Sequence, residues 1–454
     1  MRLPRALTVA GSDSGGGAGI QADLKTFAAL GVHGMSAITS ITAQNTHEVT
    51  RVVDLDPEMV VEQIRVCVED IGVDSVKTGM LHTSEIIRAV AGELRRIRAP
   101  IVVDPVMVAK SGAPLLRPDA VETLKSELLP IATVVTPNAR EAERLCGFEV
   151  KSVEDQVKAA KEIAQLGSKA VVVKGGHVPG RKVVDVVYYE GEIAELEGDR
   201  IETRNTHGTG CVFASAIAAH LAHGREVVES VKLAKRFVED AIRYGLDLGR
   251  GSGPVNPVWA AVRKARLLEA CESVRAATEL LESIEGAGRM CPESMINLVE
   301  TIEYGQTAED VVGYPGRIVR VGDKLRASTC PTPGGSRHVA SAVLVAHSFD
   351  RRVRSAMNVR FDARFIEVAK SLGYSVSSYD RSKEPPSIKQ VEGMTIRWGV
   401  GEAIKSSGRV TDLIYHTGDY GKEPMTLIFG FNAVDVVKKF QRILNSYLPS
   451  SESI

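Results

Sequence analysis

A polar, glycine-containing loop runs directly into an apolar helical pattern near the middle of the chain. The loop is Asn205-Thr206-His207-Gly208-Thr209-Gly210-Cys211, and the small apolar residues 212–219 follow it. A helix that begins here leaves several backbone N–H groups unpaired, and its dipole adds partial positive charge at the same point. We therefore expect Gly208, Thr209 and Gly210 to bind a phosphate. Because short glycine motifs are weak signals, a capped helix with a buried cysteine is the alternative.

Cys211 stands at the start of this expected helix. A helix start pushes a thiol, whose pKa is normally about 8.5, toward the thiolate form. The position therefore suggests a reactive sulfur beside the phosphate site.

Apolar runs that are rich in β-branched residues alternate with helical patterns in the first half of the chain. We expect strands at residues 6–10, 34–41, 75–80, 101–106, 132–138 and 170–176, with helices such as 85–98 and 153–165 between them. Nearly continuous apolar strands are typical of strands buried on both faces. The alternation predicts an α/β fold with a parallel sheet covered by helices on both faces.

Residues that can bind phosphate, metal or a flat ring fall just after these strands. Asp104, Asn138 and Glu141 carry hard oxygen groups suited to Mg²⁺, and Lys174 can neutralise a phosphate. Gln44 offers a donor and an acceptor together, as the edge of a heteroaromatic ring requires. Ligands of parallel sheets bind beyond the carboxyl ends of the strands. The set therefore predicts one crevice in which a phosphoryl group is transferred.

A second glycine-rich loop, Gly11–Gly19, leads into a helical pattern at residues 20–30. It lacks the Gly-Lys-Ser/Thr of a P-loop and does not fit Gly-x-Gly-x-x-Gly. We expect it to surround a small organic substrate. Asp23 in the first helical turn is either a helix stabiliser or a hydrogen-bond acceptor for that substrate.

The bulk properties limit the classes of function. At 454 residues, two domains are expected, and a formal net charge of −1 gives no general attraction for nucleic acid. We find no apolar run that could span a bilayer and no signal-peptide core, so we expect a cytoplasmic protein without a membrane partner. The six cysteines lack Cys-x-x-Cys pairs, which argues against a structural zinc site.

The first half resembles the hydroxymethylpyrimidine/phosphomethylpyrimidine kinases of the ribokinase-like superfamily. The matching runs are Gly11–Asp23, Ala43–Thr46, Lys77–Met80, Asp104–Met107 and Gly208–Cys211. The resemblance implies a ribokinase-like sandwich with helices on both faces. It also implies two successive ATP-dependent phosphorylations of 4-amino-5-hydroxymethyl-2-methylpyrimidine. The residues implied for the aminopyrimidine pocket are Gly11, Asp23, Gln44, Met80 and Met107.

The resemblance also implies that Lys174 and the Gly208 loop serve ATP and that Cys211 takes the proton from the hydroxymethyl oxygen. Most ribokinase relatives have aspartate at the position of Cys211. The role of Cys211 as a base or as a member of an anion hole therefore stays open.

The glycine- and proline-rich stretch 249–257 marks a domain boundary. We expect a kinase domain at residues 1–257, a helical connector at 258–289 and a second α/β domain at 290–454. Arginines gather in the second domain, and their planar fork suits phosphate. The loop Gly334–His338, which contains Arg337, is the expected anion site.

The second domain resembles the ThiN-type thiamine phosphate synthase domain on Gly316–Arg320, Ser336–Ala340, Ser355–Arg360 and Gly418–Pro424. The resemblance implies coupling of the pyrimidine diphosphate to a thiazole phosphate, with release of diphosphate. Arg317 would then bind the leaving diphosphate, and His338 would stabilise charge or transfer a proton.

Two alternatives remain at this point. The second domain could sense thiamine phosphate without turnover, or the first could phosphorylate pyridoxal or a sugar. Gln44 with Met80 favours a flat ring over a sugar. The expected partners are the small-molecule substrates, and homo-oligomerisation stays open.

Overall fold

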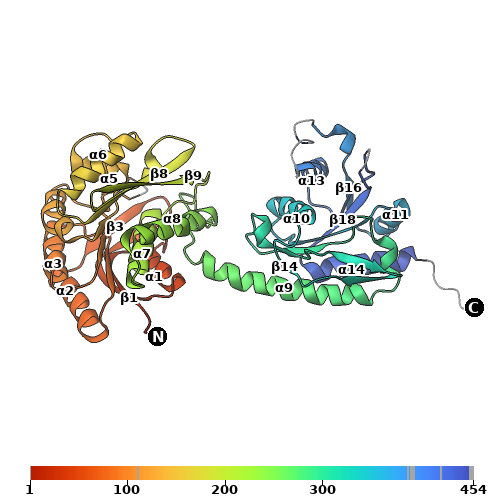
Figure 1. Ribbon diagram of the computed structural model, residues 1–454, viewed down its shortest axis with the longest axis horizontal. Coiled ribbons are helices and arrows are strands. Elements are labelled where there is room, and N and C mark those ends of the chain that lie inside the picture. Colours follow the sequence, from red (N-terminus) through yellow and green to blue (C-terminus); the bar gives the residue numbers. More distant parts are fainter. Residues whose placement is uncertain (1, 110–111, 386–387, 389–393, 420–421, 449–454) are drawn as a thin grey trace, which may run out of the picture. The chain divides into compact units, whose positions relative to one another are not determined.

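The computed structural model describes residues 2–109, 112–385, 388, 394–419 and 422–448. The chain divides into two compact units, Met1–Ala261 and Val262–Ile454, and each has its own sheet (Figure 1). The domain boundaries expected at residues 257 and 289 stay predictions.

The first unit is built on a nine-stranded sheet with the strand order β3-β2-β1-β4-β5-β6-β7-β8-β9. The six central strands β2, β1, β4, β5, β6 and β7 are parallel to one another. At the two edges, β3 pairs antiparallel with β2, β8 with β7, and β9 with β8. The strands are β1 (Arg5–Asp13), β2 (His33–Gln44), β3 (Val49–Asp54), β4 (Ser75–Thr78), β5 (Ile101–Val103), β6 (Val134–Val135), β7 (Ala170–Val173), β8 (Lys182–Tyr189) and β9 (Glu192–Asp199).

Helices cover both faces of this sheet, which explains why its parallel strands are apolar throughout (Figure 1). Successive side chains of a strand point to opposite faces, so Val103 and Val135 enter one core while Val102 and Val134 enter the other. One face carries α2 (Pro57–Val66), α3 (Ser84–Leu94), α5 (Ala139–Cys146) and α6 (Val153–Ala164); the other carries α1 (Gly19–Ala29), α7 (Thr209–Ala222) and α8 (Val227–Arg243). The predicted α/β sandwich is confirmed.

The second unit contains a seven-stranded mixed sheet with the order β14-β11-β10-β15-β18-β17-β16 and a separate β12–β13 hairpin. Its strands are β10 (Leu298–Thr301), β11 (Val311–Gly313), β12 (Ile318–Val321), β13 (Lys324–Ala327), β14 (Thr332–Pro333), β15 (Ser355–Arg360), β16 (Val376–Ser378), β17 (Leu413–His416) and β18 (Met425–Gly430). Among the described residues, its α-helices are α9 (Trp259–Ser283), which begins just before the unit boundary, α10 (His338–Phe349), α11 (Ala363–Ser371), α13 (Met394–Ser407) and α14 (Ala433–Tyr447).

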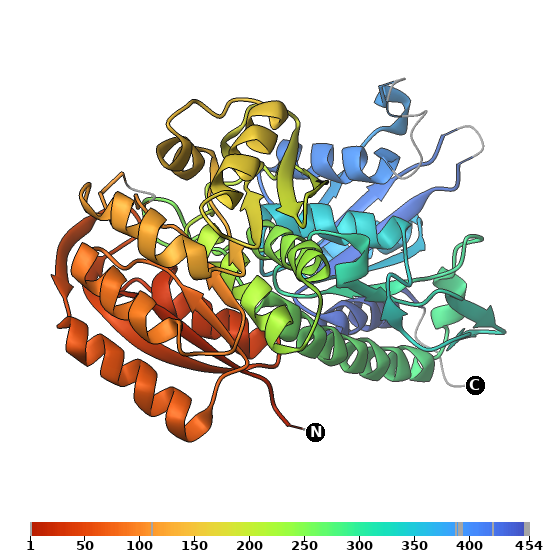
Figure 2. The ribbon, with the colours of Figure 1, turned by 60° about the vertical axis from the view of Figure 1, so that its left-hand side comes forward.

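The helices of the second unit also lie on both faces of its sheet. α10 and α13 pack over one face around Val343, Ala356 and Ile404, while α9 and α14 lie on the other side (Figures 1 and 2). The buried Glu300 of β10 joins the latter two, because it accepts hydrogen bonds from Ser273 Oγ (2.7 Å) and the Ala433 amide (2.8 Å). The long helix therefore packs on the second unit.

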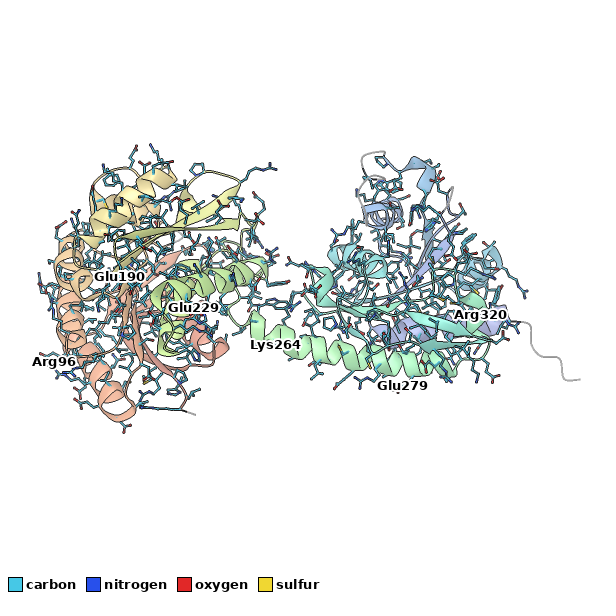
Figure 3. The ribbon with its side chains drawn as sticks, in the orientation of Figure 1. Arg96, Glu190, Glu229, Lys264, Glu279 and Arg320 are labelled. Carbon is cyan, nitrogen blue, oxygen red and sulfur yellow. The ribbon has the colours of Figure 1, made fainter. Side chains whose placement is uncertain are left out.

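Charged side chains such as Glu229 on α8 and Glu279 on α9 are exposed and point outward (Figure 3). Within the described ranges, every helix is too short or too polar to cross a membrane.

Candidate active site

One cavity of about 880 Å³ lies at the carboxyl ends of the parallel strands in the first unit. Residues from distant parts of the chain meet there because parallel strands end at the same edge of a sheet. Its lining contains these sequence-predicted residues: Gly11, Gln44, Met80, Asp104, Met107, Asn138, Glu141, Lys174, Gly208, Thr209, Gly210 and Cys211.

The loop before α7 has the form that an anion site requires. Gly208 caps the helix in the left-handed region at φ +82°, and a side chain there would collide with the Gly17 carbonyl oxygen. Among the described residues, the amides of Gly210 and Cys211 have no backbone hydrogen-bond partner. These N–H groups and the helix dipole therefore remain available for a negatively charged ligand.

A buried contact between Asp13 and His207 joins the two glycine-rich loops. Asp13 Oδ2 lies 3.0 Å from His207 Nε2 and also accepts hydrogen bonds from the amides of Gly17 (3.0 Å) and Ala18 (2.8 Å). Burial raises the pKa of the Asp13 carboxyl, but the bonds from His207 and Ala18 outweigh it and hold the pKa below its usual value. The sequence analysis did not anticipate this pairing, because nothing local relates two residues 194 positions apart.

Lys174 brings a positive charge to the same place. Its Nζ lies 3.1 Å from Asp104 Oδ1, and a Cβ built on Gly210 would lie 3.3 Å from that Nζ. Burial lowers the pKa of Lys174, but the charges of Asp104 and Glu141 outweigh burial and raise it, so the ammonium stays charged. The predicted cation and the predicted amides are therefore neighbours.

Glu141 has a structural partner as well as a place in the cavity. Its carboxylate accepts a hydrogen bond from the backbone N–H of Asn138 (2.8 Å), and Asn138 Oδ1 accepts one from the backbone N–H of Glu141 (3.0 Å). The two bonds form a capping box at the start of α5. Burial raises the pKa of Glu141 to about 7; Lys174 opposes this rise and Asp104 adds to it. Asp104 and Glu141 thus lie near one another, although within the described residues no three acidic, cysteine or histidine side chains form a metal cluster.

Asp23 is not among the residues that line the cavity, and its expected contact with the substrate stays a prediction. Both of its oxygens are satisfied inside the protein: Oδ2 by Lys77 Nζ (2.9 Å) and Thr8 Oγ1 (2.6 Å), and Oδ1 by Ser215 Oγ (2.6 Å). Lys77 does line the cavity. Asp23 is therefore the buried counterion of Lys77, a cation that the sequence showed only as part of a strand-end motif.

The Cys211 thiol is not the thiolate that its position suggested. Burial raises its pKa to about 12; Lys77 opposes the rise, while Asp23 and Asp104 add to it. The nearby Gly19 backbone lowers the pKa as well, but by less than burial and the two carboxylates raise it. Desolvation and two nearby carboxylates outweigh the helix start, so the thiol is neutral at physiological pH.

The three residues predicted for the second unit lie at one end of its sheet. Arg317 is half-buried with a left-handed φ of +67°, and Arg337 and His338, at the start of α10, are exposed. The two segments are neighbours, since a Cβ on Gly335 would lie 3.0 Å from Pro315 Cδ. In the predicted loop Gly418–Pro424, Tyr420 and Gly421 lie outside the described residues.

A second cavity of about 680 Å³, lined by residues such as Phe349, Lys405, Asp412 and Phe431, contains none of these three residues. It lies at the other end of α10.

Comparison with known proteins identifies both halves. Residues 13–256 match the family described as Phosphomethylpyrimidine kinase, and residues 273–442 match Thiamine-phosphate synthase ThiN. The chain belongs to the phosphomethylpyrimidine kinase family. It is an enzyme of thiamine biosynthesis that joins a kinase domain to a thiamine-phosphate synthase domain.

Among its relatives, the hydroxymethylpyrimidine/phosphomethylpyrimidine kinase of Rhizobium meliloti is 51% identical over 254 residues, which are 55% of this chain and 96% of that protein. The thiamine biosynthesis bifunctional protein ThiED of Geobacter sulfurreducens is 49% identical over 256 residues, 56% of this chain and 52% of that protein. Among solved structures, the ADP complex of Bacillus subtilis pyridoxal kinase matches with a TM-score of 0.54 and 41% identity, over 57% of this chain and 99% of that one.

The cap at Gly208 can be tested against a matched glycine at the other end of α7. Gly208→Ala combines a left-handed backbone with a collision, and we expect kcat of the kinase to fall at least about 100-fold, as when one oxyanion-hole donor is lost. Gly224 has a similar φ of +78° but open space around it. Gly224→Ala should therefore cost only about 1 to 2 kcal/mol of stability and keep kinase activity. Equal kinase rates in the two variants would refute the role of Gly208.

The assignment of Asp23 as a counterion predicts a loss of stability. Asp23→Ala leaves the Lys77 ammonium buried without its partner, and the free energy of unfolding should fall by about 3 to 5 kcal/mol. Adding Lys77→Met should restore most of this loss, as a urea titration of the single and double variants would measure. Wild-type stability in Asp23→Ala would instead support the substrate contact.

The raised pKa of Glu141 predicts a pH dependence with a definite sign. The folded protein favours the protonated acid, so this stabilising contribution is complete below the unfolded pKa of about 4.3 and is lost as pH rises through about 7. Glu141→Gln keeps a neutral capping side chain. We therefore expect the difference in unfolding free energy between wild type and this variant to decline as the pH rises over that range. The measurement is made in the presence of EDTA. For Glu154→Gln, whose acid has a lowered pKa, the difference should stay flat above about pH 5.

Proposed function

We propose that the first unit transfers the γ-phosphoryl group of ATP to the hydroxymethyl oxygen of 4-amino-5-hydroxymethyl-2-methylpyrimidine, and then phosphorylates the resulting monophosphate. The observation that carries this proposal is the position of the Lys174 ammonium against Gly210, beside the open amides of Gly210 and Cys211. A charged group and aligned amides stabilise a phosphoryl group in transfer, and such transfer depends mostly on positioning and charge.

The opposite part of the cavity suits the pyrimidine ring. Gln44 supplies an amide with both a donor and an acceptor, and Met80 and Met107 supply buried apolar surface. Gly11 keeps this part open, because a Cβ there would lie 3.1 Å from Met80 Sδ. The Bacillus subtilis and Staphylococcus aureus relatives of known structure are named pyridoxal kinases, so pyridoxal is the competing substrate to be measured.

The donor set of Asp104 and Glu141 fits Mg²⁺, which commonly uses one or two carboxylates and completes its shell with water and phosphate oxygens. When bound, the ion would neutralise charge on the β- and γ-phosphates. Asn138 and Thr209 line the same region and are assigned to the ATP phosphates.

We assign Cys211 to the anion hole rather than to proton abstraction. Its thiol is neutral, and its sulfur lies near Lys77 and the Gly19 backbone. A loose phosphoryl-transfer state makes little demand on a base. The side chain therefore holds the start of α7 against the substrate loop.

For the second unit, we propose coupling of the pyrimidine diphosphate to thiazole phosphate, with Arg317 and Arg337 binding diphosphate and His338 stabilising charge or transferring a proton. These groups lie on neighbouring segments at one end of the sheet. A departing diphosphate develops negative charge that such cations stabilise. Cytoplasmic location and homo-oligomerisation stay predictions from the sequence.

Two variants separate the proposed activities in one assay. The full chain receives ATP, Mg²⁺, hydroxymethylpyrimidine and thiazole phosphate, and chromatography follows the products. Wild type should form thiamine phosphate. Cys211→Ala should lose most phosphorylation while still binding the pyrimidine, because the alanine lacks the sulfur that lies between the start of α7 and the substrate loop. Arg317→Ala should accumulate the pyrimidine diphosphate.

Supplying the pyrimidine diphosphate directly should restore thiamine phosphate synthesis in Cys211→Ala but not in Arg317→Ala. If wild type accumulated the pyrimidine diphosphate without forming thiamine phosphate, the second unit would be a sensor. If the first unit phosphorylated pyridoxal faster than hydroxymethylpyrimidine, the substrate assignment would be overturned.

A further inference from the structure

A group of buried side chains in the second unit lies at the same end of the sheet as its sequence motifs. His416 at the end of β17 pairs with Met425 of β18, and Met425 pairs with Arg360 of β15. Directly paired residues share a face, and neighbouring strands lie about 4.8 Å apart. His416 therefore faces the same side as the end of the Ser355–Arg360 motif, and it accepts the Gly418 amide at Nδ1 (3.2 Å).

Two charged side chains near Tyr379, the buried Glu384 and the half-buried Arg381, each have a buried atom without a hydrogen-bond partner among the described residues. Glu384 is 5% exposed, and among the described residues its Oε1 has no hydrogen-bond donor. The buried Arg381 Nε likewise has no acceptor. A buried carboxylate oxygen without a donor is costly, so the arrangement favours a ligand that supplies one.

Aromatic rings pack together around Tyr379. The Tyr379 ring lies 5.1 Å from His416 and 6.2 Å from Trp398, measured between ring centroids. Gly399 permits this packing, since a side chain there would collide with the Tyr379 ring. Burial, reinforced by Arg381, lowers the pKa of His416 to about 4, so its ring is neutral. The surroundings combine flat rings with one unpaired acceptor and one unpaired donor.

We propose that Glu384, Arg381 and the rings of Tyr379 and His416 form the pocket that binds the aminopyrimidine ring in the second unit. This inference rests on the synthase function proposed above. An amino group beside a ring nitrogen presents a donor next to an acceptor. The Glu384 carboxylate accepts from the amino group, and Arg381 Nε donates to the ring nitrogen. A thiazole nitrogen carries no hydrogen, so it leaves Glu384 unsatisfied.

The first test is steady-state kinetics of the full chain with the pyrimidine diphosphate and thiazole phosphate supplied directly. Glu384→Gln should raise KM for the pyrimidine diphosphate about 10- to 100-fold, the loss expected for a hydrogen bond to a charged group, and leave KM for thiazole phosphate within about twofold. Glu402→Gln, on α13 and paired with the exposed Lys405, is the matched control and should leave both constants unchanged. A rise in KM for thiazole phosphate, or no change in either, would overturn the assignment.

The second test does not depend on turnover. Trp398 lies in the aromatic group and Trp259 at the start of α9, so Trp398→Phe identifies the fluorescence signal of the pocket. Thiamine phosphate should quench Trp398 in wild type, and Glu384→Gln should weaken that binding about 10-fold or more while thiazole phosphate binds as before. If Glu384→Gln unfolds in a thermal melt, Arg381→Gln replaces it with the same expectation.

The two tests distinguish failure of the pocket from failure of the synthase proposal. If the full chain shows no synthase turnover but Glu384→Gln still weakens binding of thiamine phosphate, the pocket is supported and only the proposed synthase activity is refuted. Absence of thiamine phosphate binding to wild type, or equal binding to both proteins, overturns the pocket.

Discussion

The active site of the kinase unit depends on the contact between the two glycine-rich loops. Asp13 receives hydrogen bonds from one loop and lies against His207 of the other, and Gly208 fits where no side chain can. This contact fixes the start of α7 relative to the end of β1. The amides at that helix start can therefore point into the cavity without a ligand to hold them, which lowers the reorganisation that binding would otherwise require.

Sequence patterns were enough to predict the arrangement of the parallel strands and most of the cavity lining. Continuous apolar runs such as residues 170–173 define buried strands, and polar residues at their ends, such as Lys174, converge by geometry alone. The edge strands β8 and β9 were not predicted, because strands covered on one face mix buried and exposed residues. The roles of Asp23 and Cys211 depend on neighbours distant in the sequence, and only the folded chain reveals them.

The same reasoning explains which residues of the second half could not be predicted from the sequence. Arg317, Arg337 and His338 could be selected by resemblance to a family, but Glu384 and Arg381 carry no local motif. They become notable only because the fold leaves Glu384 Oε1 and Arg381 Nε buried without partners, among the described residues, near Tyr379. Under the two proposals, each unit offers a paired donor and acceptor to a flat ring: one through the single amide of Gln44, the other through two opposite charges. The two proposed pockets would then bind the same ring through different side chains with matching hydrogen-bonding patterns.

The neutral state of Cys211 has a consequence for the chemical durability of the enzyme. Peroxides and alkylating agents attack thiolates, so a thiol with a pKa of about 12 is a poor target, whereas the exposed Cys330 remains open to modification. Oxidative damage would therefore fall first on the second unit and spare the phosphoryl-transfer site. A sulfur in this position is shielded from oxidants by the same desolvation that keeps its proton in place.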